Sequence, residues 1–246
     1  MPNYLDYLNH VQNLIQKVAE HEAKIIEKAA HVFLEATVRK HNIFVFGASH
    51  AGIIAHEMVY RAGGLATVNP IEAPSLNLGV RPITHTSQME RLDGYGTLIA
   101  RTVPIKNGDV ILVHSVSGRN TVMIDFVLEA KKKAVTIIAL TNVTYSKSVT
   151  SRHASGQRLF ELADIVIDNH GTIGDASMAF EGLSQKVAPT STVIGASIVN
   201  AILVETVRLC LERGVDAPIL HSANLDDGDA YNQKLFEIFK DNIFYL

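Results

Sequence analysis

Two short segments of the chain concentrate residues that can bind an anion. The first reads Phe46-Gly47-Ala48-Ser49-His50-Ala51-Gly52, and the second reads His114-Ser115-Val116-Ser117-Gly118-Arg119-Asn120. Each segment follows an apolar run and precedes a helical pattern. Small residues let the backbone approach an anion closely, and the free N–H groups at a helix start favour negative charge. The second segment adds hydroxyl, amide and guanidinium donors. We therefore predict a phosphate site, with a capped tight turn as the alternative for each segment.

Neither segment carries a nucleotide-binding signature. A dinucleotide site would need G-x-G-x-x-G after the first strand, and a nucleoside triphosphate site would need a Walker A loop. Both motifs are absent from the sequence. The expected ligand is therefore a smaller phosphorylated molecule.

The elements that must position these segments alternate between strands and helices. The predicted strands are 43–46, 65–68, 110–114, 134–140 and 165–167, and the predicted helices are 50–62, 121–132 and 192–211. Continuous apolar strands joined by helical crossovers are typical of a parallel sheet covered on both faces. In such a sheet, ligands bind beyond the carboxyl ends of the strands, which is where both segments fall.

The ends of the chain and one internal stretch differ from this pattern. Residues 4–40 have apolar side chains at steps of three or four, which predicts one long helix or a broken pair. We treat 1–40 as a helical segment that packs on the domain or on a dimer partner, and 41–246 as the main body of one structural domain. Residues 70–105 lack clear periodicity, so we expect a long insertion there, a feature that is often functional.

Composition excludes several classes of function. A net charge of −3 and a pI near 6.4 argue against a nucleic-acid partner. The chain has neither a basic-then-apolar leader nor 18 uninterrupted apolar residues, so we expect a cytoplasmic protein without a membrane partner. Its single cysteine, Cys210, predicts a buried thiol and no internal disulfide. The scattered histidines predict no metal, and no cofactor is expected.

The motifs together resemble those of the sugar isomerase (SIS) domain family. The stretch Ser115–Asn120 is similar to that family's S-x-S-G-x-[TN] signature, and 46–65 is similar to its first loop and helix. The resemblance extends to about residue 223. It is strongest to a bacterial branch related to phosphoheptose isomerases and N-acetylmuramic acid 6-phosphate etherases. The quoted branch motifs are Glu57-Met58-Val59-Tyr60-Arg61-Ala62-Gly63-Gly64-Leu65, Gly94-Tyr95-Gly96, Ser117-Gly118-Arg119-Asn120, Ser151-Arg152-His153, Ser155-Gly156 and Pro189-Thr190-Ser191-Thr192-Val193-Ile194-Gly195.

This resemblance implies a fold and an assembly. The expected fold is a flavodoxin-like three-layer α/β/α sandwich with a five-stranded parallel sheet. The expected assembly is a homodimer or higher homo-oligomer, in which the long N-terminal and C-terminal helices pack across subunits.

The first loop departs from the family's pattern. The branch usually reads Gly-x-Gly-His-Ser, whereas Ser49 stands here at the second glycine and Ala51 at the phosphate-binding serine. Either Ser49 supplies the missing hydroxyl from two residues earlier, or the loop binds phosphate less strongly. The main phosphate ligands are then expected in the second loop, with Ser115, Ser117 and Asn120 as the leading donors, and with Gly118 and Arg119 beside them.

The resemblance also implies catalytic residues. Glu57 matches the family's catalytic glutamate on the helix after the first loop, where a carboxylate can act as a general base. The alternative is an ion pair between Glu57 and Arg61, one turn later. His50 is a second candidate, as a catalytic or phosphate-binding donor or as a helix cap. Further ligand-facing candidates are Arg61, Thr190, Ser191 and Thr192.

The expected function is therefore to bind a phosphorylated sugar and most simply to isomerise it by general acid–base catalysis. Two alternatives stay open at this point. One is a non-catalytic module that senses a phosphosugar, and the other is an amino-sugar phosphate etherase or lyase. The sequence does not specify the sugar.

Overall fold

Five parallel strands form the central sheet of the computed structural model, which describes residues 1–246. They are β1 (Ile43–Gly47), β2 (Val68–Pro70), β3 (Val110–His114), β4 (Thr136–Thr141) and β5 (Ile165–Asp168). Their spatial order is β2-β1-β3-β4-β5, and every neighbouring pair is parallel. The predicted flavodoxin-like sandwich with a five-stranded parallel sheet is confirmed. The chain reverses its direction across the sheet between β1 and β3, and ligands bind at such a switch point in open α/β sheets.

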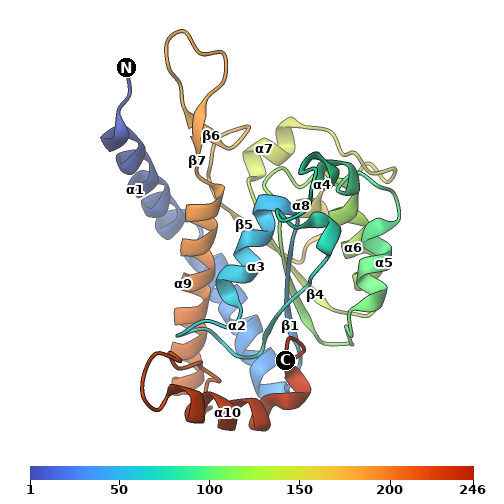
Figure 1. Cartoon of the computed structure of the whole chain (residues 1–246), viewed down its shortest axis with the longest axis vertical. Coiled ribbons are helices and arrows are strands. Elements are labelled where there is room, and N and C mark those ends of the chain that lie inside the picture. Colours follow the sequence, from blue (N-terminus) through green and yellow to red (C-terminus); the bar gives the residue numbers. More distant parts are fainter.

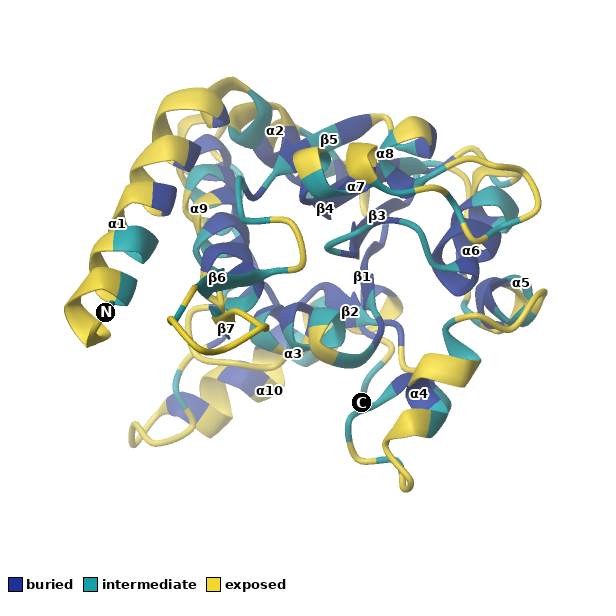
Figure 2. Ribbon diagram, turned by 90° about the horizontal axis from the view of Figure 1, so that it is seen from above, coloured by how far each residue is buried: buried dark blue, intermediate teal, exposed yellow.

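Helices cover both faces of this sheet (Figures 1 and 2). One layer contains α1 (Tyr4–His21), α2 (Ala23–Arg39), α3 (Ile53–Met58) and α9 (Ser191–Glu212), and the other contains α5 (Tyr95–Thr102), α6 (Thr121–Lys131) and α8 (Leu159–Leu162). Strand side chains alternate between two cores. Ile43 and Val45 pack in the α2, α3 and α9 core, whereas Phe44 and Phe46 pack in the α5 and α6 core.

The N-terminal segment is the broken pair of helices that the sequence allowed. Glu22 separates α1 from α2. Asn3 caps α1, since its side chain accepts from the Leu5 N–H at 2.8 Å and its own N–H donates to Asp6 at 2.7 Å. α2 packs against α9, and α1 continues alongside α9 beyond the carboxyl edge of the sheet (Figure 1).

The first crossover differs from the sequence prediction. The helix expected over 50–62 is a 3₁₀ turn (Ser49–Gly52) followed by α3, which ends at Met58, and the strand expected at 65–68 lies at 68–70. The C-terminal part of the chain explains the shift. Leu65 forms a bridge with Ile219, and the Ala66 N–H donates to the Pro218 carbonyl at 2.8 Å, so these residues pair away from the sheet.

Several short elements lie outside the strands and helices that the sequence predicted. The insertion 70–105 contains a 3₁₀ turn (Pro74–Leu76), α4 (Thr84–Met89) and α5. α7 (Val143–Ser148) follows β4, and β6 (Ala176–Met178) pairs with β7 (Val187–Pro189) in a small antiparallel hairpin. The chain ends with α10 (Gly228–Phe239) and a 3₁₀ turn (Lys240–Asn242). Of these, α4 and α7 reach the candidate site.

α9 is long and apolar enough to cross a membrane, judged by length and composition alone. Buried residues make up 44% of its most apolar window. These include Ile194, Ile198 and Ile202, which pack in the core beside α2 and α3. α9 is thus a core helix of one layer, and its outer side carries exposed apolar residues.

Candidate functional site

The two donor-rich loops meet at the switch point. β1 and β3 are adjacent, with Gly47 opposite His114, so the segments that follow them leave the sheet side by side. Between them lies a cavity of about 200 Å³. It is lined by Ala48, Ser49, His50, Ala51, Glu90, Ser115, Val116, Ser117, Asn120, Met123, Tyr145 and Asp175. Five of the expected phosphate-site residues, namely Ser49, His50, Ser115, Ser117 and Asn120, therefore share one cavity.

The end of β4 holds the second loop in place through its backbone. The Thr141 hydroxyl donates to the Ser115 carbonyl at 2.7 Å, and the Asn142 N–H donates to the Val116 carbonyl at 3.0 Å. The hydroxyls of Ser115 and Ser117 have no hydrogen-bond partner within the chain. Because the backbone is fixed while these hydroxyls stay free, the loop presents two preorganised donors to the cavity.

Gly118 and the start of α6 complete this loop. Gly118 has φ of +60°, and a Cβ there would meet the Ser146 hydroxyl at 3.0 Å, so a larger residue would be strained. α6 begins immediately after Asn120, and no side chain caps it. The helix start thus adds backbone N–H groups and the positive end of the helix dipole beside the serine hydroxyls.

The first loop makes its tight turn through Gly47. A Cβ at Gly47 would lie 2.4 Å from the Ala51 carbonyl oxygen, which only glycine tolerates. Ser49 has a positive φ of 51° and donates from its hydroxyl to Glu90 Oε1 at 2.6 Å. His50 is exposed at the rim and makes no hydrogen bond within the chain. The Ser49 hydroxyl therefore points into the cavity but already has a partner.

Glu90 is a cavity residue that the sequence did not identify. Its carboxylate accepts from Ser49 of the first loop and from the Asn120 amide of the second loop. Asn120 in turn accepts from Arg152 at 2.7 Å. Glu90 lies at the end of α4 in the aperiodic insertion, 41 residues from Ser49 and 30 from Asn120. No local sequence spacing could have revealed this pairing.

A second carboxylate, that of Asp175, contacts the start of α9 from the segment before β6. Asp175 accepts from the N–H groups of Thr190 and Ser191 at 3.1 and 2.8 Å, and from the Ser191 hydroxyl at 2.6 Å. Thr190 and Ser191 were expected to face the ligand, and here they bind Asp175, which itself lines the cavity. Thr192 is not among the residues that line the cavity.

Glu57 and Arg61 lie in a different cavity, of about 250 Å³, between α3 and α9. Glu57 forms an ion pair with Arg61 and accepts from Asn200 Nδ2 at 2.9 Å. This is the ion pair that the sequence offered as the alternative. α3 turns the Glu57 side chain toward α9, so Glu57 does not line the same cavity as the serine hydroxyls. Its catalytic role stays a prediction.

His114, the last residue of β3, connects the start of the second loop to the backbone of the first loop. Its side chain is buried, and its Nδ1 lies 3.0 Å from the Ala51 carbonyl oxygen, to which an Nδ1–H must donate. Burial lowers the pKa of His114, against smaller opposing effects of the Ala51 hydrogen bond and the Asp175 charge. The ring is therefore neutral near pH 7. Its buried Nε2 has no partner.

The site's chemistry is that of polar donors and carboxylates. The structure has no group of three or more His, Cys, Asp or Glu side chains arranged to hold a metal ion. The cavity offers hydroxyl and backbone donors for an anion on one side, and a carboxylate that can exchange protons on the other.

Comparisons with known proteins identify the family of this chain. A model of the SIS domain matches residues 6–142. The UPF0309 protein ABC0887 of Shouchella clausii is 50% identical over 240 residues, with 98% of each chain covered. The UPF0309 protein OB3413 of Oceanobacillus iheyensis is 49% identical over 241 residues, again with 98% of each chain covered.

Solved structures with the same fold include two phosphoheptose isomerases. The enzyme from Francisella tularensis superposes with a TM-score of 0.55 at 16% identity, covering 84% of this chain and 100% of that one. The enzyme from Neisseria gonorrhoeae gives a TM-score of 0.50 at 15% identity, covering 84% of this chain and 95% of that one. At this identity the likeness concerns the fold. On the sequence matches, the chain belongs to the SIS domain family and, within it, to the UPF0309 proteins.

Proposed function

We propose that this protein binds a phosphorylated sugar in the cavity between the two loops, with the phosphate against Ser115, Ser117 and the start of α6. The observation that carries the proposal is the pair of unpartnered serine hydroxyls on a fixed backbone beside an uncapped helix start. Phosphate oxygens are strong acceptors that match this set of donors. Arg119, in the same loop, adds a positive charge.

The same cavity supports proton transfer, and we propose an isomerase reaction with Glu90 as the general base. Isomerisation of an aldose to a ketose moves a proton between neighbouring carbons, which suits a carboxylate in a partly desolvated cleft. Glu90 is a half-buried carboxylate that lines the cavity, whereas Glu57 does not line it. Two solved structures of the same fold are phosphoheptose isomerases, which supports an isomerase reaction. His50 at the rim is a second candidate for proton transfer.

One observation favours the sensor alternative. Glu90 accepts from two donors in the free protein, so it must leave Ser49 and Asn120 before it can take a proton from a substrate. A ligand that displaces Glu90 would move the adjoining α4 segment, which a partner protein could detect. Proton abstraction in an etherase or lyase would use the same carboxylate, so turnover of different substrates separates these reactions.

We also propose that the protein is a cytoplasmic homodimer that associates through α1 and α9. Tyr4, Leu5 and Leu8 on α1 and Val204 and Leu211 on α9 are exposed apolar residues. The outer side of α1 is exposed along much of its length (Figure 2). Association would remove this apolar surface from water, which is the main driving force for obligate interfaces.

A thermal-shift screen of sugar phosphates tests the binding proposal directly. A ligand present at 100 times its dissociation constant stabilises the folded state by about 2.7 kcal/mol. We expect one or more sugar phosphates to raise the melting temperature, and the corresponding free sugars to leave it unchanged. If no sugar phosphate stabilises the protein, the proposal is wrong.

A further inference from the structure

Three arginines lie together beside the cavity. Arg152 donates from Nη1 to the Asn120 side chain at 2.7 Å, and its backbone N–H donates to the Arg119 carbonyl at 2.9 Å. Arg91 directly follows Glu90. Burial, and after it the positive charges of Arg91 and Arg119, lower the pKa of Arg152. Arg152 therefore lies near both Arg91 and Arg119 at the edge of the phosphate site, and their like charges oppose its own.

None of the three arginines forms an ion pair. Most other arginines of the chain do, such as Arg158 with Glu161 and Arg208 with Glu205. The nearby carboxylate of Glu90 is bound instead to Ser49 and Asn120. The Nε of Arg119 is buried without any hydrogen-bond partner. A buried, unpartnered guanidinium N–H in a cluster of like charges is unfavourable unless an anion joins it.

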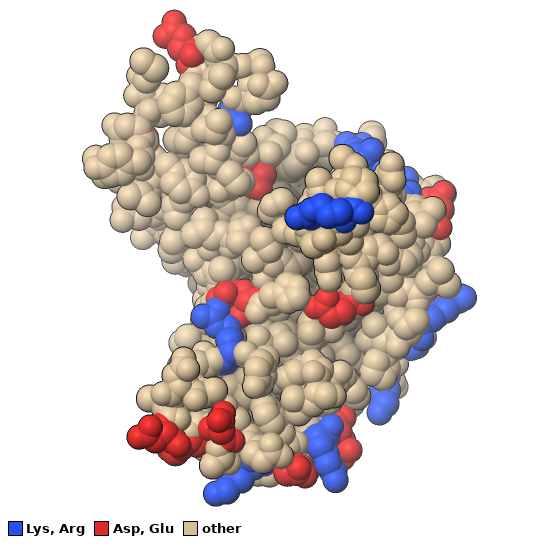
Figure 3. Space-filling view, in the orientation of Figure 1, with Lys and Arg blue, Asp and Glu red and all other residues tan.

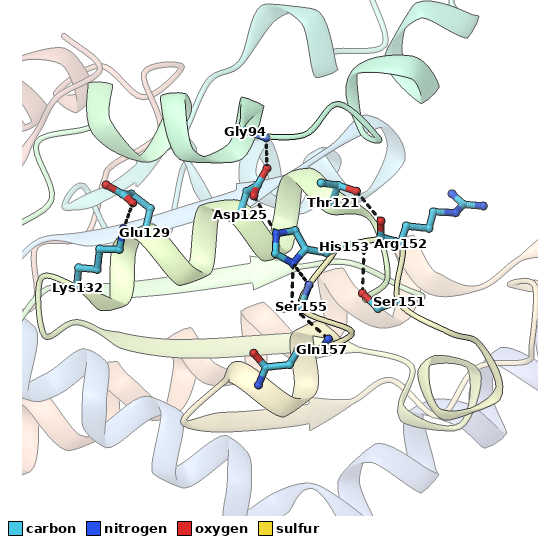
Figure 4. A network of polar contacts seen from close by, with 10 residues as sticks. All are labelled: Gly94, Thr121, Asp125, Glu129, Lys132, Ser151, Arg152, His153, Ser155 and Gln157. Carbon is cyan, nitrogen blue, oxygen red and sulfur yellow. Dashed lines mark hydrogen bonds and ion pairs between the residues drawn. The ribbon is translucent and has the colours of Figure 1, made fainter.

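The loop that carries Arg152 is fixed by a polar network (Figure 4). His153 Nε2 lies 3.1 Å from Asp125 of α6, and His153 Nδ1 lies 2.8 Å from the Ser155 hydroxyl. The Thr121 hydroxyl donates to the Arg152 carbonyl at 3.2 Å. In Figure 4 the guanidinium of Arg152 points away from this network. The arginine backbone is thus ordered before any ligand arrives, which lowers the entropic cost of binding.

Ser155, His153 and Asp125 are in contact in the order of a hydrolytic triad. Their other hydrogen bonds show that they instead hold the loop in place. The Ser155 N–H also donates to His153 Nδ1 at 3.1 Å, and the Ser155 hydroxyl accepts from the Gln157 N–H at 3.2 Å. Asp125 accepts from the Gly94 N–H at 2.7 Å as well. The network therefore ties the 151–157 loop to α6 and to the start of α5.

We infer that Arg91, Arg119 and Arg152 form a second anion subsite, which binds a carboxylate or a second phosphate on the sugar phosphate held by the Ser115 and Ser117 loop. The inference rests on the proposed function and narrows its substrate class to sugar phosphates with two negatively charged groups. Figure 3 shows Lys and Arg side chains on the surface near α4, in a protein whose net charge is −3.

Isothermal titration with matched ligand pairs tests this inference. The first pair is glucose 6-phosphate and 6-phosphogluconate, which differ by a carboxylate. The second pair is fructose 6-phosphate and fructose 1,6-bisphosphate, which differ by a phosphate. Arg91→Gln is the main variant, because the Arg91 side chain makes no hydrogen bond within the chain, and its backbone hydrogen bond to Gln88 is kept in the variant. Arg81→Gln is the control, since Arg81 is an exposed arginine of the same insertion that also lacks an ion pair and bonds only to the Leu78 and Val80 carbonyls.

We expect the doubly charged member of at least one pair to bind wild-type protein at least tenfold more tightly than its singly charged partner. Arg91→Gln should reduce that advantage at least fivefold, and Arg81→Gln should retain it. The pair that shows the advantage identifies the second group as carboxylate or phosphate. If the members of each pair bind equally, or if Arg91→Gln weakens both equally, the subsite does not exist although the phosphosugar function stands. If no member of either pair binds, and the wider thermal-shift screen finds no ligand, both proposals fail.

Discussion

The hydroxyl of Ser49 donates a hydrogen bond of 2.6 Å to the carboxylate of Glu90. Ser49 is the residue that could have replaced the missing hydroxyl at Ala51 in the first loop. In the free protein that hydroxyl, together with the Asn120 amide, binds a carboxylate of the same chain. A phosphate at this position would compete with Glu90 for both donors. The free hydroxyls of Ser115 and Ser117 face no such competition.

Ser117→Ala should therefore weaken phosphosugar binding more than Ser49→Ala. A hydrogen bond to a charged group contributes about 1.5–3 kcal/mol, so the dissociation constant should rise about tenfold or more for Ser117→Ala. Ser49→Ala should change it much less, because the Ser49 hydroxyl already donates to Glu90 in the free protein, so the variant loses a hydrogen bond in the unbound state as well as in the complex. Titration with the best ligand from the thermal-shift screen measures both.

Ser87→Ala is a matched control for this comparison, since Ser87 is exposed on α4 and makes no hydrogen bond through its side chain. It should bind like wild type. Normal binding by Ser117→Ala together with weak binding by Ser49→Ala would mean that the first loop holds the phosphate.

Two glutamates compete for the role of general base, and the Gln variants separate them. Glu90→Gln keeps the size and most hydrogen bonding but removes the basic group. We expect turnover to fall by a factor of about 10²–10⁴, as is typical of general acid–base catalysis, with phosphosugar affinity within about tenfold. Steady-state kinetics and titration on the same preparation give both values.

Glu57→Gln should leave turnover unchanged. The side chains of Glu57 and Arg61 are 26% and 48% exposed, so the loss of their ion pair should cost less than about 1 kcal/mol of stability. A large loss of turnover in Glu57→Gln with an active Glu90→Gln would support the assignment made from the sequence. If the wild-type protein binds sugar phosphates but converts none of them, the sensor function is the better proposal.

The parts of the fold that the sequence predicted are those set by local patterns. The strand 110–114 and the helix 192–211 have continuous apolar runs with clear turn signals, and their bounds agree with β3 and α9 within a residue. β2 begins three residues later than predicted, because Leu65 pairs with Ile219, which lies 154 residues further along the chain. Single-sequence periodicity carries no information about such contacts.

In the candidate site, too, only the parts that local sequence patterns determine were predictable. The two loops follow adjacent strands, so their serines could be placed at one edge of the sheet from the pattern alone. Glu90 could not, because it reaches the cavity from an insertion without periodicity. The neighbours of Glu57 also depended on tertiary structure. The position of Glu57 on its helix was compatible with a side chain in the phosphate-site cavity and with an ion pair to Arg61. Only the packing of α3 on α9 distinguishes these two arrangements.

His114 should make the stability of the protein depend on pH. Burial lowers its pKa in the folded state, below the ordinary value of 6.5 that applies to the unfolded chain. Below pH 6.5 the unfolded chain binds a proton that the folded protein does not, so stability falls as the pH falls. Above pH 6.5 both states are neutral and the contribution is complete.

The variant His114→Asn isolates this effect, because its amide can replace the Nδ1–H donor to Ala51 but does not titrate. We expect the free energy of unfolding, measured with urea between pH 5 and 7.5, to decline less steeply with falling pH in the variant than in wild type. The comparison of slopes is independent of any uniform loss of stability from the smaller side chain. Parallel slopes would show that His114 does not titrate differently in the two states.

The last prediction concerns assembly through α9. Val204 and Leu211 are both 70% exposed and lie two turns apart on the same side of the helix. Full burial of such a side chain contributes about 1.5–3 kcal/mol, whereas a buried, unpaired carboxylate at the same position is strongly unfavourable. Val204→Glu should therefore convert a dimer into a folded monomer, with circular dichroism unchanged. Leu98→Glu, at a 60% exposed leucine of α5 in the opposite layer, should remain dimeric. Sedimentation velocity from low to high micromolar concentration measures all three proteins. A wild-type protein that stays monomeric throughout this range, or a Val204→Glu variant that stays dimeric, would contradict an interface on α9.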